Sequence, residues 1–289
     1  MIGPAVIKTV ATLREEVRGW RRQGERVALA PTMGGLHEGH LALVRRGGEL
    51  APRVVVSIFV NPIQFNRADD FQRYPRDLKG DLEKLTPLAV EAVYAPEALE
   101  MYPAGFASSI AVRDLAAGLC GPHRPGHFEG VATVVAKLLL QAEPDFALFG
   151  EKDWQQLQIV RRMVRDLDIP VVIEGVATVR EPDGLAMASR NVFLSTDERK
   201  IASALPRTLF ALADELAPGG LAAPALGRGV ESLTRAGFAK VDYLDLVEAD
   251  TLKPAPRVAG ACRIAAAAWL GATRLIDNVP VGPEASRRA

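Results

Sequence analysis

The sequence has little of several features that mark particular classes of protein. Its 289 residues include two cysteines and 6% aromatic residues, and its formal net charge is +0. Cys120 and Cys262 lack the C-x-x-C spacing of metal and redox sites, so we expect two free thiols and a reducing, cytoplasmic location. Without a basic excess or many aromatic side chains for base stacking, nucleic acid is not an expected partner.

Long apolar runs are also missing. No stretch approaches the roughly 20 apolar residues that cross a bilayer, so we expect no membrane partner. Lys8 and the charged residues 14–16 leave no room for the apolar centre of a signal peptide. The remaining profile, 48% hydrophobic and 24% charged residues, is typical of a globular protein with one large or two medium domains.

Short apolar runs alternate with helical patterns through the first two thirds of the chain. The runs are continuous rather than alternating, which indicates buried strands of a parallel sheet covered on both faces. We therefore predict an α/β domain over residues 1–187. Its first helix is expected to begin with a capping box at Thr12-x-x-Glu15 and to end at Gly24. The predicted strands are Val27–Ala30, Val54–Val60, Val90–Tyr94, Phe146–Phe149 and Val171–Ile173, and further helices are predicted at Leu78–Leu85, Val131–Leu140 and Gln155–Leu167.

The sequence pattern changes in residues 188–289, for which we predict a smaller α+β domain. A helix is expected over Thr196–Leu216 and a loop over residues 217–228. Four later runs suggest an α+β unit with an antiparallel sheet, and Glu284–Ala289 are expected to form a frayed tail. These runs are Leu233–Phe238, Tyr243–Val247, Ile264–Trp269 and Arg274–Asp277.

The segment Pro31–His40 is the most informative part of the chain. It follows a predicted strand and opens a predicted helix, whose first N–H groups are unpaired and attract phosphate. His37 and His40 add two imidazoles at the same point, although such a pair can also bind a metal or lie idle on the surface. We interpret the segment as one that handles a nucleotide triphosphate.

Two more polar loops follow predicted strands. Asn61–Gln64 follows the second strand and Gly150–Asp153 follows the fourth. Ligands of open α/β sheets bind at the carboxyl ends of the strands, so the three loops predict a pocket at one edge of the sheet.

Six ordered strings in this chain resemble the pantothenate synthetase family. Trp269–Gly271 and Arg274–Asn278 extend the resemblance toward the C-terminus. The strings are Pro31–His40, Ser57–Phe65, Tyr74–Arg76, Arg124–Val131, Phe149–Gln156 and Ser189–Asn191.

The resemblance implies a Rossmann-like N-terminal domain and an ATP-dependent ligation. (R)-pantoate and β-alanine would be condensed to pantothenate, with AMP and pyrophosphate as products, through a pantoyl-adenylate intermediate. Mg²⁺ would be required, and family members are usually homodimers.

The resemblance also implies roles for individual residues. His40 is the expected catalytic residue, and His37, Lys152 and Arg190 would stabilise charge on the phosphates. Ala188 stands where the family commonly has a second serine, so a hydroxyl contact is lost there unless the backbone N–H suffices. The expected ATP-binding residues are Pro31, Thr32, Met33, Gly34, Gly35, Leu36, His37, Glu38, Gly39, His40, Gly150, Glu151, Lys152, Asp153, Val179, Met187, Ala188, Ser189 and Arg190.

For pantoate, the resemblance points to side-chain amides. Gln64 and Gln156 can read a hydroxyl and a carboxylate oxygen, and Asn61 belongs to the same group. Tyr74 and Arg124 are either substrate contacts or structural residues.

Five other polar residues are given weaker interpretations. Asp81 is a weak candidate for a Mg²⁺ contact, and Asp69-Asp70 is interpreted as a solvated acidic pair. His123 and His127 are interpreted as parts of a loop or lid rather than as catalysts.

Two alternatives stay open on the sequence alone. A nucleotidylyltransferase that moves AMP onto a phosphorylated acceptor would share the histidine motif but would not need the paired glutamines. A nucleotide-sensing module without catalysis is disfavoured by the intact His40, Lys152 and Arg190.

Overall fold

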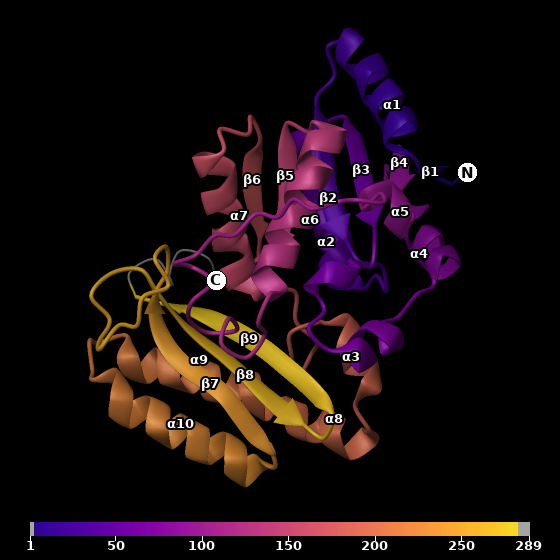
Figure 1. Cartoon of the computed structure of the whole chain (residues 1–289). Coiled ribbons are helices and arrows are strands. Elements are labelled where there is room, and N and C mark those ends of the chain that lie inside the picture. The colour runs from indigo at the N-terminus through magenta and orange to yellow at the C-terminus, as the bar shows by residue number, and fades with distance from the viewer. Residues whose placement is uncertain (1–2, 283–289) are drawn as a thin grey trace. The chain divides into compact units, whose positions relative to one another are not determined.

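The structure, a computed structural model, describes residues 3–282 and divides into two compact units (Figure 1). The predicted tail Glu284–Ala289 lies outside the described residues. Unit 1 consists of residues up to Val112, Arg124–Glu151 and Gln156–Val179; unit 2 consists of Arg113–His123, Lys152–Gln155 and the chain from Arg180 onward. The predicted domain boundary at 187/188 stays a prediction.

Unit 1 is built on a parallel sheet, as predicted, and the sheet has six strands rather than the five expected. The strand order is β1-β4-β3-β2-β5-β6, so the order of the sheet reverses between β2 and β5. A reversal of this kind is where open α/β sheets bind ligands, at the carboxyl ends of the strands. The strands are β1 (Ala5–Ile7), β2 (Val27–Thr32), β3 (Arg53–Ile58), β4 (Ala92–Tyr94), β5 (Phe146–Gly150) and β6 (Val172–Val176).

The sheet of unit 1 is buried on both faces, which explains its continuous apolar runs. On one face, Ala28 and Val54 pack with Val44 of α2 and Leu85 of α4. Leu29 points to the other face by alternation and is also fully buried. The helices are α1 (Val10–Arg22), α2 (Glu38–Leu50), α3 (Ala68–Arg73), α4 (Leu78–Leu85), α5 (Ala98–Met101), α6 (His127–Ala142) and α7 (Trp154–Asp166), with 3₁₀ turns η1 (Pro62–Gln64) and η2 (Glu151–Asp153).

The start of α1 differs from the prediction. The N-cap is Thr9, whose backbone is extended and whose side chain accepts a hydrogen bond from the Thr12 N–H. The predicted capping box at Thr12 and Glu15 was therefore wrong by one turn. Gly24, with φ +77°, follows the end of the helix as predicted.

In unit 2, two prolines change the predicted helix boundaries. The expected helix Thr196–Leu216 is divided into α8 (Thr196–Ala202) and α9 (Ala204–Leu216). Pro206, the third residue of α9, cannot donate to the Ala202 carbonyl, so one continuous helix is disfavoured. The expected loop 217–228 instead contains the start of α10 (Ala222–Ala236), where Pro224 lies in a first turn that needs no N–H donor.

Unit 2 has an antiparallel sheet of three nine-residue strands, β7 (Lys240–Glu248), β8 (Cys262–Leu270) and β9 (Thr273–Val281). One face packs on α9 and α10, and its core includes Leu244, Ile264 and Val279. The 3₁₀ turn η3 (Ser189–Phe193) precedes α8.

The segments 113–123 and 152–155 join unit 2 through polar contacts. Gln155 donates to the Leu115 and Gly118 carbonyls and accepts from the Cys120 N–H. The Cys120 thiol lies 3.1 Å from the Tyr243 hydroxyl on β7. Burial raises the pKa of the neighbouring Asp242. Hydrogen bonds donated by Lys240, Arg274 and Trp269 outweigh this effect and lower the pKa to about 2.

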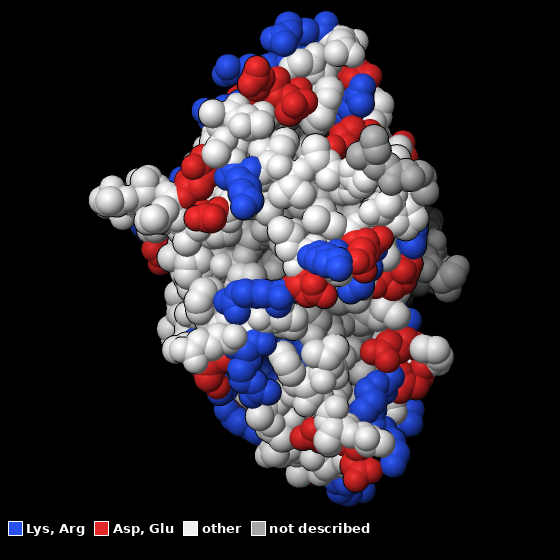
Figure 2. Space-filling view, turned by 90° about the vertical axis from the view of Figure 1, so that its right-hand side faces the viewer, with Lys and Arg blue, Asp and Glu red and all other residues white. Residues whose placement is uncertain are grey.

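Charged side chains of both signs are interspersed on the face shown in Figure 2, in keeping with the formal net charge of +0. Within residues 3–282, every helix is too short or too polar to cross a membrane.

Gly130 of α6 offers a test of how unit 1 shapes the loop after β3. A Cβ on Gly130 would lie 2.5 Å from the Ile63 carbonyl oxygen and 2.7 Å from the Gln64 Cα. We expect Gly130→Ala to lower the free energy of unfolding by about 1–3 kcal/mol, because backbone must move. Urea unfolding measures this.

Gly48 of α2 is the matched control, since a Cβ added there would have no atom within 4 Å. Gly48→Ala should raise the free energy of unfolding by about 0.5–1 kcal/mol through helix propensity alone. A lower free energy of unfolding in Gly48→Ala, or an unchanged one in Gly130→Ala, would contradict this account of the contact between α6 and the loop after β3.

Candidate active site

The two histidines of the β2–α2 segment cap the start of α2. His37 is the N-cap residue, and its Nδ1 accepts from the Gly39 N–H at 3.2 Å. His40 reaches back, and its Nδ1 accepts from the His37 N–H at 3.3 Å. The ring centroids are 4.1 Å apart, and a Cβ on Gly39 would lie 2.9 Å from the His37 ring. The capping box thus brings the two rings together.

These contacts determine which ring nitrogens carry protons. A nitrogen that accepts a backbone N–H bond has no proton, so in each neutral ring the proton is on Nε2. Both Nε2–H groups are therefore donors at the positive end of the helix. Such an arrangement can stabilise an anion and is poorly suited to removing a proton with Nδ1.

The preceding turn is held from α4. Asp81 is 1% exposed, and its two oxygens accept from the N–H groups of Gly35 at 2.9 Å and Leu36 at 2.7 Å. Lys84, one turn further along α4, donates to the Leu36 carbonyl at 2.7 Å. Gly34 and Gly35 have φ of +79° and +61°, a conformation that side chains disfavour. The turn before His37 is thus held by two side chains of α4 and by glycines that tolerate its backbone.

The predicted pantoate residues Asn61 and Gln64 are buried and form a cluster with the half-buried Met33. The Asn61 amide donates to Gln64 Oε1 at 2.9 Å, and Gln64 Nε2 donates to Met33 Sδ at 3.0 Å. Asn61 Oδ1 also accepts from the Tyr102 hydroxyl at 2.7 Å. Burial raises the pKa of Tyr102, which keeps this hydroxyl protonated as a donor. Tyr102 was missed because it lies in none of the motif strings.

Arg124 reaches the same cluster through His127. Arginine can only donate, so its Nη1 donates to His127 Nε2 at 2.9 Å, and His127 Nδ1 then donates to the Gln64 carbonyl at 2.9 Å. His127 is buried as the first residue of α6, so its assignment to a loop was wrong. The motif string that contains Arg124 and His127 was the available signal.

Tyr74, by contrast, lies in an aromatic cluster. It is 5% exposed and packs edge-on against Phe65, with ring centroids 5.8 Å apart. This packing favours the structural alternative for Tyr74, while a substrate contact stays a prediction.

The remaining predicted residues divide between the two units. Gly150, Glu151, Gln156 and Val179 belong to unit 1, as does the whole segment Pro31–His40. Unit 2 contains Lys152, Asp153 and the segment Met187–Arg190.

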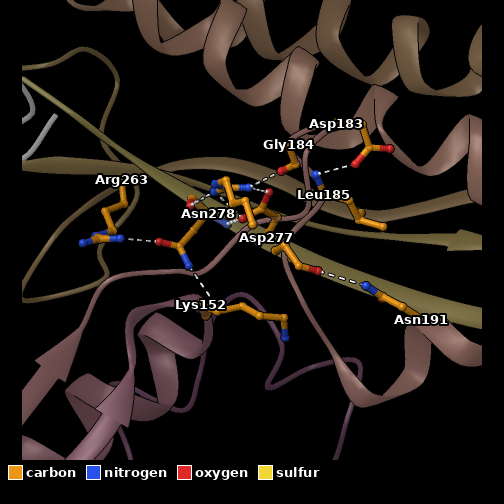
Figure 3. A network of polar contacts seen from close by, with 10 residues as sticks. Lys152, Asp183, Gly184, Leu185, Asn191, Arg263, Asp277 and Asn278 are labelled. Atoms are coloured by element: carbon orange, nitrogen blue, oxygen red, sulfur yellow. Dashed lines mark hydrogen bonds and ion pairs between the residues drawn. The ribbon is translucent and has the colours of Figure 1, made fainter. Parts of the chain in front are cut away.

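In unit 2, the turn before Met187 is held by charged side chains (Figure 3). Arg180 binds Asp277 of β9 at 2.7 and 3.0 Å and donates to the Gly184 carbonyl at 2.9 Å. Burial raises the pKa of Asp277, an effect that Arg180 opposes. Asn191 donates to Glu181 Oε1 at 2.9 Å and to the Ala186 carbonyl at 3.1 Å. The segment Met187–Arg190 thus lies between Gly184, which Arg180 holds, and Asn191, which binds Glu181 and the Ala186 carbonyl.

Lys152 is held by its main chain. Its carbonyl accepts from Asn278 of β9 at 2.8 Å, and its ammonium lies 3.6 Å from Asp153 Oδ2 (Figure 3). The Lys152 side chain is 18% exposed.

The described residues do not fit a protein-built Mg²⁺ cage. Among residues 3–282, no three His, Cys, Asp or Glu side chains are grouped as a metal site. Both oxygens of the candidate Asp81 already accept backbone N–H bonds. Asp69 pairs with Arg67 on the surface, with half of each side chain exposed.

The parallel sheet, its point of reversal and the doubly capped helix after β2 place unit 1 in the class of Rossmann-like, nucleotide-binding α/β folds. The model of the pantoate–β-alanine ligase family matches residues 5–280. The chain therefore belongs to the pantoate–β-alanine ligase family, and it is an amide-forming ligase.

Individual relatives agree with this placement. A pantothenate synthetase of Paramagnetospirillum magneticum is 54% identical over 278 residues, which cover 96% of this chain and 98% of the relative. The crystal structure of pantothenate synthetase from Thermus thermophilus aligns with a TM-score of 0.91 at 48% identity, covering 96% of this chain and 100% of that one.

A third relative was crystallised with ligands. The pantoate–β-alanine ligase of Francisella tularensis, complexed with β,γ ATP and β-alanine, aligns with a TM-score of 0.81 at 31% identity. The alignment covers 95% of this chain and 97% of that chain.

Asp81 gives a test of the turn before His37. In Asp81→Asn, one oxygen becomes an NH₂ group that faces a backbone N–H, so we expect a loss of about 1–3 kcal/mol in the free energy of unfolding. Urea unfolding measures the loss, and hydrogen exchange of the Gly35 and Leu36 amides localises it.

Asp77, the N-cap of α4, supplies the control because Asn caps a helix as well as Asp does. Asp77→Asn should change the unfolding free energy by only a few tenths of a kcal/mol. Equal losses in the two variants would show that the Asp81 contacts carry no special weight.

Proposed function

We propose that the chain performs the ATP-dependent condensation of pantoate with β-alanine in two steps, in keeping with the pantoate–β-alanine ligase family to which it belongs. In the first step, a pantoate carboxylate oxygen attacks the α-phosphorus of ATP, the bond to the bridging oxygen breaks, and pyrophosphate leaves. In the second step, the β-alanine amine attacks the acyl carbon, loses a proton, and displaces AMP.

The observation that carries this proposal is the capped start of α2. His37 and His40 accept backbone N–H bonds with Nδ1, so in the neutral rings the proton is on Nε2. In the proposal, these Nε2–H groups and the helix end stabilise the charge that develops on the phosphates during adenylation. A carboxylate nucleophile is already deprotonated, so the first step needs no base at this position.

The other residues of unit 1 supply binding contacts in the proposal. Main-chain groups of the segment Pro31–His40, Gly150, Glu151 and Val179 would contact ATP. Gln64, Asn61 and Gln156 would bind pantoate, for which the cluster around Gln64 supplies amide donors and acceptors that are already oriented. Arg124 would act through His127 on the Gln64 main chain.

In unit 2, the proposal assigns phosphate contacts to Lys152 and Arg190. Asp153, Met187, Ala188 and Ser189 would complete the ATP-binding residues of this unit. Ala188 offers only its backbone N–H to a phosphate. We include Mg²⁺ as a companion of the ATP phosphates rather than as a resident of a protein cage. A cytoplasmic homodimer is likewise part of the proposal.

Pyrophosphate exchange tests the order of steps. We expect labelled pyrophosphate to exchange into ATP with pantoate and Mg²⁺ and without β-alanine. Exchange that requires β-alanine, or that occurs only with a phosphorylated acceptor, would instead support a concerted ligation or a nucleotidylyltransferase.

His40→Ala tests the assignment of charge stabilisation. Loss of one such donor lowers the rate by about 10²–10³-fold, and we expect that loss in the exchange rate with pantoate affinity nearly unchanged. Loss of the helix cap costs about 1 kcal/mol, which urea unfolding separates from the catalytic effect.

His123→Ala is the matched control, since His123 lies outside the predicted site and 3.8 Å from Asp242 in unit 2. It should leave the exchange rate near that of the parent protein. A similar loss in both variants, or equal losses in rate and pantoate affinity for His40→Ala, would overturn the assignment.

A further inference from the structure

The C-terminal strand β9 holds the main chain of Lys152 (Figure 3). We propose that Asn278 is a positioning residue for ATP use: it acts by fixing the Lys152 backbone and touches no substrate itself. This inference rests on the phosphate contact proposed for Lys152.

The Asn278 amide is buried, 4% exposed, and has one favoured orientation. Its Nδ2 donates to the Lys152 carbonyl at 2.8 Å, while its Oδ1 accepts from Arg263 Nη1 at 2.5 Å. A flipped amide would place oxygen against the carbonyl and nitrogen against the guanidinium, so both contacts select the same rotamer. The Asn278 main chain is also fixed, because its N–H donates to Asp277 Oδ1 at 2.7 Å.

Arg263 connects this contact to a second one, two residues beyond Lys152. Its guanidinium lies 3.5 Å from the centroid of the Trp154 ring, and the Trp154 indole N–H donates to the Ala249 carbonyl at 2.7 Å. Arg263 is itself 6% exposed. The segment 152–154 is thus held at the Lys152 carbonyl and at the Trp154 side chain by residues of unit 2.

This two-point attachment matters because of the chemistry of lysine. Lysine carries its charge on a flexible four-carbon stem, so its backbone position decides which points the ammonium can reach. Phosphoryl transfer depends on placement, and a shift of about 1 Å can cost about 100-fold in rate. A residue that fixes the Lys152 carbonyl therefore affects ATP use without contacting ATP.

The test variant is Asn278→Asp, which removes the donor to the Lys152 carbonyl and keeps an acceptor for Arg263. In steady-state assays we expect kcat/KM for ATP to fall by about 10-fold or more, with KM for pantoate changed by less than about twofold. Trp269→Phe is the matched control: it removes the indole donor to Asp242 in the same sheet and should leave the ATP parameters unchanged.

A double-mutant cycle with Lys152→Ala separates positioning from general stability. If Asn278 acts through Lys152, Asn278→Asp should cause little further loss in the Lys152→Ala background. Additive losses, or equal losses for ATP and pantoate, would overturn the inference while leaving the proposed role of Lys152 intact. An unchanged kcat/KM for ATP in Lys152→Ala alone would overturn that proposed role, and the inference with it.

Arg263→Lys provides a second variant if Asn278→Asp does not fold. It retains a positive charge near Asn278 but loses the flat group on the Trp154 ring. We expect a loss of about threefold or more in kcat/KM for ATP that again disappears in the Lys152→Ala background. A loss that persists there would contradict the positioning role.

Discussion

The loops of both units depend on one constraint: peptide groups that are buried in a loop must find hydrogen-bond partners. Side chains from distant elements provide those partners. Asp81 and Lys84 form hydrogen bonds with the main chain of the turn before His37, and His127 donates a hydrogen bond to the Gln64 carbonyl. In unit 2, Asn278 and Arg180 do the same for Lys152 and Gly184. Apart from Arg180, which is four residues from Gly184, the side chains that hold these loops lie 45 or more positions away in sequence.

The same constraint limits what the two histidines can do. Because each Nδ1 accepts a backbone N–H bond in the cap of α2, the proton of each neutral ring is on Nε2. In the proposed reaction the pair would therefore stabilise charge rather than remove a proton with Nδ1. Adenylation of a carboxylate calls for such stabilisation, since its nucleophile carries no proton and its difficulty is the charge on the phosphoryl oxygens.

The sequence predicted the parts of the fold that depend on local pattern. Continuous apolar runs located β2, β3 and β5, because a strand covered on both faces leaves no polar position. The edge strand β1 was missed, because its three residues include an exposed Val6 and show no pattern. The α8–α9 break was missed because apolar spacing continues across it, and only the absent N–H of Pro206 shows where one helix must stop.

For the candidate site, the sequence suggested residues but not the contacts between them. Motif strings named His37, His40, Gln64 and Lys152. Nothing local to those strings indicates that Tyr102 donates to Asn61. Nor do they indicate that both Asp81 oxygens accept hydrogen bonds from backbone N–H groups. Such contacts join residues about 40 or more positions apart, so they follow from the packed sheet and helices rather than from spacing.

Strand alternation explains how a single dipeptide of β9 can serve two loops. Leu275 and Val279 face the helices of unit 2, so Asp277 points to that side and Asn278 to the other. On the helix side, Asp277 binds Arg180, whose guanidinium also lies 5.0 Å from the ring centroid of Phe210 on α9. On the other side, Asn278 binds the Lys152 carbonyl. Since register fixes both directions at once, a one-residue slip of β9 would release the turn before Met187 and the Lys152 segment together.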